Sequence, residues 1–130
     1  MMTTELTVLA LAGLLQGGQF LIFEILGNMQ VGLGYSTSPR DTQRHLTGMA
    51  GRSQRAMNNH FESLILFTIA VVVIHLGDKG SGLSAWLAWT YLGARILYVP
   101  AYLFGLSPWR SFIWCIGAVA TMLMLLMAVI

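Results

Sequence analysis

Four long stretches of apolar residues constrain the fold of this chain more than any other feature. A helix that crosses the hydrocarbon core of a bilayer needs about 20 mostly apolar residues. The stretches run from about residue 6 to 26, 59 to 76, 83 to 104 and 109 to 130. Their apolar residues are continuous rather than alternating, which favours helices over strands. The sequence therefore predicts an all-α membrane protein, a bundle of four transmembrane helices.

The composition agrees with a membrane protein. Of the 130 residues, 56% are hydrophobic and only 9% are charged, whereas about a quarter of residues are charged in soluble domains. The same composition excludes a disordered chain and a nucleic-acid-binding module, so we expect no nucleic-acid partner. Because the four stretches take up most of the length, residues 1–130 are predicted to form one membrane domain.

The basic residues of the connecting loops predict the orientation. Five arginines lie in or directly after the first loop, about residues 33–51, or directly after the third loop: Arg40, Arg44, Arg52, Arg55 and Arg110. The second loop carries one basic residue, Lys79. Since basic loops stay on the cytoplasmic side, the first and third loops are predicted to face the cytoplasm and both termini to lie outside.

Charged residues inside the predicted spans point to a polar site. A charge at the centre of a membrane helix costs about 2.5–3.5 kcal/mol on insertion scales, and the chain holds at least three charged residues at some depth in its spans: Glu24, Glu62 and Arg95. At 100° per residue, one helix face of about 80° holds four polar side chains: Arg52, Arg55, Asn59 and Glu62. A face of about 60° on the next helix holds four more: Tyr91, Arg95, Tyr98 and Tyr102.

Two polar faces at matching depth have two readings. Polar residues in membrane helices often serve as packing contacts between helices or subunits, and spacing alone supports this as well as a ligand site. The mixture of arginine, asparagine, glutamate and tyrosine favours a cavity that opens to the cytoplasm and binds an anionic or zwitterionic ligand. Within it, Glu62 and Arg95 are expected to neutralise each other.

The remaining reactive residue types predict no further chemistry. The three histidines lack the spacing of metal ligands and no Cys-x-x-Cys is present, so no metal site is expected. The single cysteine, Cys115, lies among Phe112, Trp114 and Ile116 and is predicted to be a buried apolar residue rather than a nucleophile.

Two of these segments resemble a known family. The run from Arg55 to Glu62 reads RAMNNHFE, with Arg52 before it. It resembles the RAxxNxxE signature of the MAPEG family, the membrane-associated proteins in eicosanoid and glutathione metabolism. Residues 94–102 and the pair Arg110-Ser111 also look like the family pattern. The resemblance covers nearly the whole chain, and the loop sequence at residues 38–41 looks most like bacterial members.

The resemblance implies a homotrimer with the second helices near the three-fold axis and sites between neighbouring subunits. It implies that glutathione, as co-substrate, is held at the cytoplasmic side, with its thiol facing a catalytic Arg110. The implied binding residues are Arg52, Arg55, Asn59, Glu62 and Arg95, with Tyr98 and Tyr102 from the neighbouring third helix. The chain departs from several catalytic members at Ser63, where they carry an aromatic residue.

Three functions follow as hypotheses. The first is a glutathione transferase or peroxidase that acts on lipophilic electrophiles through an arginine-stabilised thiolate. The second is a non-catalytic membrane trimer that binds a lipid or a thiol. The third is a small multidrug transporter, suggested by Glu24 in the first span. In each case we expect an integral membrane protein, in a bacterial inner membrane, with itself, membrane lipids and a lipophilic small molecule as partners.

Overall fold

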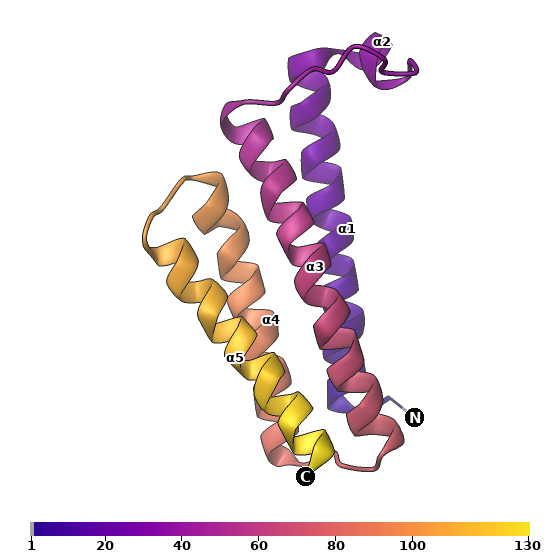
Figure 1. Cartoon of the computed structure of the whole chain (residues 1–130), viewed down its shortest axis with the longest axis vertical. Helices are drawn as coiled ribbons and strands as arrows, with labels where there is room; N and C mark the ends of the chain where they lie inside the picture. The colour runs from indigo at the N-terminus through magenta and orange to yellow at the C-terminus, as the bar shows by residue number, and fades with distance from the viewer. Residues whose placement is uncertain (1) are drawn as a thin grey trace.

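The computed structural model describes residues 2–130 and consists of long helices that run up and down (Figure 1). The long helices are α1 (Thr4–Val31), α3 (Gly48–Leu76), α4 (Gly82–Leu103) and α5 (Trp109–Val129). A short helix, α2 (Leu33–Ser36), follows α1. At the end that carries α2, α1 and α3 extend beyond α4 and α5 (Figure 1). At this end α1 and α3 therefore project past the α4–α5 turn, and the ends of α4 and α5 form the rim of the bundle.

The helix bounds differ from the predicted spans mainly at α3. The apolar stretch that begins near residue 59 is only the membrane part of a helix that begins at Gly48. The preceding turns are polar, so hydropathy did not mark them as part of a span, although Arg52 and Arg55 were expected at the start of this helix; the residues assigned to the loop that prove helical are 48–51. Residues 33–36 of that loop are helical as well. Arg52 and Arg55 are thus held on a rigid helix.

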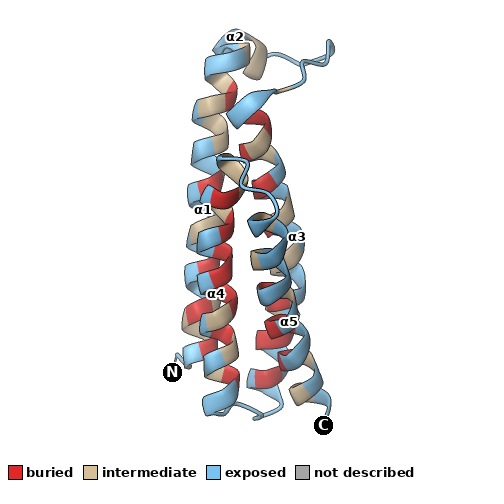
Figure 2. Ribbon diagram, turned by 90° about the vertical axis from the view of Figure 1, so that its left-hand side faces the viewer, coloured by how far each residue is buried: buried red, intermediate tan, exposed pale blue. Residues whose placement is uncertain are grey.

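The apolar core fills the half of the bundle away from α2. Buried residues line the inward faces of the helices, while the outward faces are exposed (Figure 2). The Phe67 ring of α3 stacks on the Tyr91 ring of α4 with a centroid distance of 3.9 Å. The other core residues are Val8, Ala12, Ala70, Val71, Ile74, Ala88, Leu92, Ala120 and Met124. The opposite half is left for polar side chains.

The outer surface of the bundle is apolar. Leu14, Trp86 and Phe112 are exposed by 73%, 75% and 67%, a pattern that suits lipid rather than water. Helices α1, α3 and α5 are long and apolar enough to cross a membrane. The protein is therefore an all-helical integral membrane protein. Cys115 lies on this surface, so its predicted burial is wrong: α5 turns this apolar face outward.

Polar contacts fix α1 against its neighbours. Near the start of α1, the Ser84 hydroxyl donates to the Glu5 carboxylate at 2.5 Å. Halfway along α1, Gln16 Oε1 lies 2.7 Å from His60 Nδ1 of α3. His60 is fully buried and faces α1, so the neighbouring Asn59 faces the other helices. These contacts set the rotation of α3 and so decide which of its residues reach the site.

Candidate functional site

Two arginines enclose Tyr102 near the rim of the bundle. Arg55 of α3 donates through Nε to the Tyr102 hydroxyl at 3.2 Å. The guanidinium carbon of Arg110, in the first turn of α5, lies 4.5 Å from the Tyr102 ring centroid. A guanidinium at this distance from an aromatic face is attracted by its electrons. One chain thus brings together three residues from three helices that the sequence placed in the site.

Tyr98 joins this cluster to Arg95, deeper in the bundle. The Tyr98 and Tyr102 rings meet edge to face with centroids 5.6 Å apart. The guanidinium carbon of Arg95 lies 4.2 Å from the Tyr98 centroid. Because the three residues are spaced three and four positions apart on α4, they lie on one helix face, as the sequence predicted.

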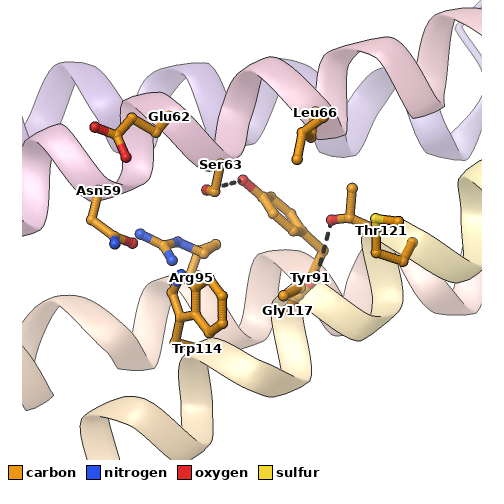
Figure 3. A pocket seen from close by; sticks show the side chains of 11 residues that line it. Asn59, Glu62, Ser63, Leu66, Tyr91, Arg95, Trp114, Gly117 and Thr121 are labelled. Atoms are coloured by element: carbon orange, nitrogen blue, oxygen red, sulfur yellow. Dashed lines mark hydrogen bonds between the residues drawn. The ribbon is translucent and has the colours of Figure 1, made fainter.

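Arg95 borders a cavity of about 360 Å³ between α3, α4 and α5 (Figure 3). Asn59, Glu62 and Ser63 contribute polar groups to its lining, and Leu66, Trp114 and Met122 contribute apolar ones. The cavity therefore has a polar end and an apolar end. Such a space suits a ligand that is itself charged at one end and apolar at the other.

The expected ion pair between Glu62 and Arg95 is not formed within the described chain. Arg95 is only 2% exposed, and its Nε and Nη2 atoms have no hydrogen-bond partner among residues 2–130. Glu62 is exposed and borders the cavity with Asn59 rather than bonding to Arg95 (Figure 3). The Asn59 Oδ1 atom is also buried without a partner. Buried polar groups without partners are costly, so these atoms are candidates for contacting a ligand or a second subunit.

Arg52 lies apart from the Tyr102 cluster. Its Nε donates to the carbonyl of Leu103 at 2.8 Å, at the C-terminal end of α4. The carbonyls of a last helical turn lack partners within the helix, and a cation is favourable there. Arg52 therefore holds the end of α4 in place, a supporting role that the polar face of α3 did not reveal.

The cavity includes Tyr91, which the sequence placed on the polar face of α4 without a binding role, and two residues of α5 that the sequence did not single out. The Tyr91 hydroxyl lies 2.9 Å from the Ser63 hydroxyl and closes the cavity toward the core (Figure 3). Gly117 and Thr121 of α5 lie one turn apart on the opposite wall. A glycine and a threonine four positions apart in an apolar helix were the only available signal, and it is typical of packing as well.

The electrostatics of the site favour an anion. Arg55, Arg95 and Arg110 surround the two tyrosines, and Glu62 is the one carboxylate that lines the cavity. Arg110 lies in the first turn of α5, where the helix dipole repels cations and attracts anions. An anion near Tyr102 would therefore be stabilised by the guanidinium and by the helix end together. The described residues contain no group of three or more His, Cys, Asp or Glu that could hold a metal ion.

Comparison with known proteins decides the family. The family model of the MAPEG family matches residues 4–130, essentially the whole described chain. The chain belongs to the MAPEG family. No curated protein and no solved structure matches it. Membership in the MAPEG family agrees with the apolar helices and is consistent with a glutathione-related function in a membrane.

Proposed function

We propose that this MAPEG protein binds glutathione beside Tyr102 and Arg95 and transfers it to lipophilic electrophiles. The observation that carries the proposal is the group of guanidiniums around Tyr98 and Tyr102, which continues into a cavity with an apolar end. Glutathione is an anion with two carboxylates, one ammonium and a thiol. The site offers arginines for the carboxylates and Glu62 for the ammonium.

The arginines suit the carboxylates of glutathione for a geometric reason. A planar guanidinium can donate two parallel hydrogen bonds to one carboxylate. Arg55 uses only its Nε on Tyr102, which leaves its terminal nitrogens for a ligand. The unpartnered Nε and Nη2 of Arg95 and the Oδ1 of Asn59 lie further in. Together they form a set that a small zwitterionic peptide would satisfy.

Arg110 suits the thiol. The reactive form of a thiol is the thiolate, and a free thiol with a pKa near 8.5 is mostly protonated at neutral pH. A neighbouring cation stabilises the thiolate, and Arg110 combines its charge with the N-terminal end of α5. The proton leaves to solvent when the thiolate forms.

The reaction itself needs no further cofactor. The thiolate sulfur attacks the electrophilic carbon and forms a C–S bond, while the leaving group departs with the electrons of its own bond to that carbon. The electrophile reaches the sulfur from the apolar end of the cavity, where Leu66 lies, whereas Trp114 lies beside Arg95 (Figure 3). This arrangement restricts the substrates to compounds that dissolve in lipid.

The proposed assembly is a trimer in which α4 forms the fourth membrane span. Helix α4 has 22 residues, long enough to cross a membrane. The outer face of α3 has no partner within the described chain: Phe61, Ile65 and Ile69 are exposed by 57%, 54% and 46%. Glu62 lies among them. Packing of this face around a three-fold axis would bury the apolar side chains and bring Glu62 to the boundary between subunits.

Turnover by the purified protein in lipid nanodiscs tests the proposal. With glutathione, we expect conjugation of an activated aryl chloride or reduction of a lipid hydroperoxide. Arg110→Ala is expected to lower kcat by about a hundredfold, the size of effect seen when one group that stabilises a developing anion is removed. Lys79→Ala, a cation in the α3–α4 turn at the opposite end, is the matched control and should leave turnover unchanged.

Two results would contradict the enzyme. Unchanged turnover in Arg110→Ala would remove the thiolate role of that residue. Binding of glutathione without conjugation over a broad panel of electrophiles would instead favour the non-catalytic binder. Glu24 lines a different cavity, near α2, from the one beside Arg95, so the transporter hypothesis has a separate test: proton-coupled export that survives Glu24→Gln would remove the reason for it.

A further inference from the structure

A second cavity, of about 210 Å³, lies at the end of the molecule that carries α2. It is formed by the last turns of α1, by α2 and the loop after it, and by α3. None of its lining residues belongs to the site around Tyr102. Cavities for drug-sized ligands are about 300–1,000 Å³, so this one suits a smaller chemical group.

The cavity carries charges of both signs at separate places. Glu24 belongs to α1, whereas Arg40 and Arg44 belong to the loop after α2. No ion pair joins Glu24 to either arginine within the described chain, and no described residue donates a hydrogen bond to its carboxylate. Opposite charges that share a small cavity without contacting each other are complementary to a ligand that is itself a zwitterion.

The two arginines are held in place by the surrounding backbone. Arg44 Nη1 donates to the Val31 carbonyl at 3.1 Å, and the guanidinium carbon lies 4.6 Å from the Tyr35 ring centroid. The backbone N–H of Arg44 donates to the Tyr35 hydroxyl at 3.0 Å. Arg40 Nε donates to the Ser36 carbonyl at 3.0 Å. Both side chains are exposed, and each guanidinium keeps N–H groups for an anion while one of its nitrogens bonds to the backbone.

The depth of the cavity identifies the source of such a ligand. Helix α1 has 28 residues, which at 1.5 Å each gives about 42 Å, close to the thickness of a bilayer with its headgroups. Glu24 lies seven residues before the end of α1 at Val31, or about 10 Å along the helix. The cavity thus lies where the headgroups of one leaflet meet the hydrocarbon.

We propose that this cavity binds a phosphate monoanion that also carries a primary ammonium, the chemistry of a phosphoethanolamine headgroup. The phosphate contacts Arg40 and Arg44, and the ammonium contacts Glu24. Guanidiniums bind phosphate oxygens well, and a primary ammonium brings three N–H donors to a carboxylate. The apolar lining residues Phe23 and Leu46 accommodate the carbon atoms between the two charges.

Competition between two phospholipids with identical acyl chains tests this proposal. The full-length protein is loaded with equal amounts of phosphatidylethanolamine and phosphatidylglycerol, and native mass spectrometry counts the retained lipids. We expect a preference for phosphatidylethanolamine of about fivefold, since a half-exposed ion pair contributes up to about 1 kcal/mol. Glu24→Gln should abolish the preference and still retain phosphatidylglycerol. Asp78→Asn, in the distant α3–α4 turn, is the control and should keep it.

Variants of Gly27 test the contribution of the cavity volume to lipid binding separately from that of the charged side chains. At Gly27, an added Cβ would lie 3.6 Å from Leu46 Cδ1 and 3.8 Å from Phe23 Cε1, ordinary contact distances. Gly27→Ala should therefore fold and bind normally, whereas Gly27→Val fills part of the cavity and should lower retention of both lipids. If Glu24→Gln retains the two lipids in the same ratio as the unchanged protein, the proposal is wrong.

Soluble glycerophosphoethanolamine identifies the source of the ligand. If it displaces bound phosphatidylethanolamine at micromolar concentration, the site takes a free metabolite. If the soluble compound does not displace the lipid, the site takes the lipid itself. In both cases the ligand is bound by the same residues, Glu24, Arg40 and Arg44. Equal retention of phosphatidylethanolamine and phosphatidylglycerol by the unchanged protein, with no binding of the soluble compound, would overturn the proposal. Glutathione turnover is measured on Glu24→Gln in parallel and should be unchanged. A failure of the lipid proposal can therefore be distinguished from a failure of the proposed glutathione function.

Discussion

Tyr102 is the residue around which the candidate site is arranged. It accepts a hydrogen bond from Arg55, and Arg110 lies against its ring. A cation–π contact contributes about 0.5–2 kcal/mol, and two guanidiniums around one ring both raise the positive potential at that place. No described carboxylate contacts either of them. This positive potential favours an anion beside Tyr102, as the proposed function requires.

Arg110 determines the thiol chemistry in the proposed function. In Arg110→Ala, the thiol of bound glutathione should titrate at a higher pH, near the usual value of about 8.5, because the cation that stabilises the thiolate is gone. The proposed function therefore predicts that the bound thiol is mostly ionised at neutral pH in the unchanged protein and mostly protonated in the variant. Ultraviolet absorbance of the thiolate, followed against pH, measures the midpoint.

The variant Arg110→Lys separates the effect of the positive charge from the effect of the guanidinium geometry. A lysine keeps the positive charge but not the planar donor group, so its midpoint should lie between those of the unchanged protein and the alanine variant. Identical midpoints in all three proteins would show that Arg110 does not act on the thiol.

The spacing of Arg95, Tyr98 and Tyr102, read at 100° per residue, correctly predicted that they share one face of α4. It could not predict where the long side chains point. Arg52 shares a face with Arg55 in the sequence, yet it turns to the Leu103 carbonyl, because the end of α4 happens to lie beside it. Such a contact depends on where another helix ends, which local periodicity does not report.

At the scale of the helices, a small polar contact holds α4 against α1. Ser84 completes a capping box with Ser81 at the start of α4 and also donates to Glu5 of α1. Glu5 is only 6% exposed, and a buried carboxylate is costly without a donor. The start of α4 is therefore fixed at the end of the molecule away from the site.

Ser84→Ala removes both contacts and should destabilise the protein. We expect a loss of about 1–3 kcal/mol, the cost of leaving a buried polar group without its partner. Reversible unfolding in mixed micelles with increasing denaturing detergent measures it. Thr90→Ala is the matched control on the same helix, because its hydroxyl bonds only to the Trp86 carbonyl of α4 itself. A Ser84→Ala variant as stable as the control would contradict the role of this contact.

The sequence predicted the long helices but not all of their bounds or their contributions to the cavity. Helix α3 begins at Gly48 because polar turns can continue a helix beyond the bilayer, where hydropathy no longer marks it. Helix α5 supplies Gly117 and Thr121 to the cavity. Almost every residue of α5 is apolar, so only packing against α4 reveals which of its faces points inward.

At the scale of the whole molecule, positive charge gathers at one end. Five of the seven basic residues lie in the loop after α2, in the first turns of α3 or in the first turn of α5, and Lys79 lies in the turn between α3 and α4; Figure 1 shows that this turn is at the opposite end of the molecule from α2. Basic residues stay on the cytoplasmic side of a membrane. This asymmetry is a property of the folded chain and of the sequence alike, so it was predictable from the start.

Labelling of single cysteines tests the orientation. In a Cys115→Ala background, a cysteine at Ser38 lies in the long loop and one at Gly80 lies in the α3–α4 turn. A maleimide that cannot cross membranes should label Gly80→Cys in intact cells and label Ser38→Cys only after the cells are opened. The reverse pattern would place the proposed glutathione site outside.

The mass of the intact protein tests the assembly. Native mass spectrometry from nanodiscs should give three times the 14.3 kDa of one chain. Ile65→Arg places a charge on the exposed apolar face of α3 and should shift the protein toward monomers, whereas Trp86→Arg, on the outer face of α4, should leave the trimer intact. A monomer in the unchanged protein would rule out sites shared between subunits.

The central claim is that the guanidiniums around Tyr102 bind glutathione, and calorimetric titration of the reconstituted protein tests it most directly. We expect saturable binding that weakens at least tenfold in Arg55→Ala, since a hydrogen bond to a charged group contributes about 1.5–3 kcal/mol. Lys79→Ala should bind as the unchanged protein does. No saturable heat, or an equal affinity in Arg55→Ala, would contradict the account.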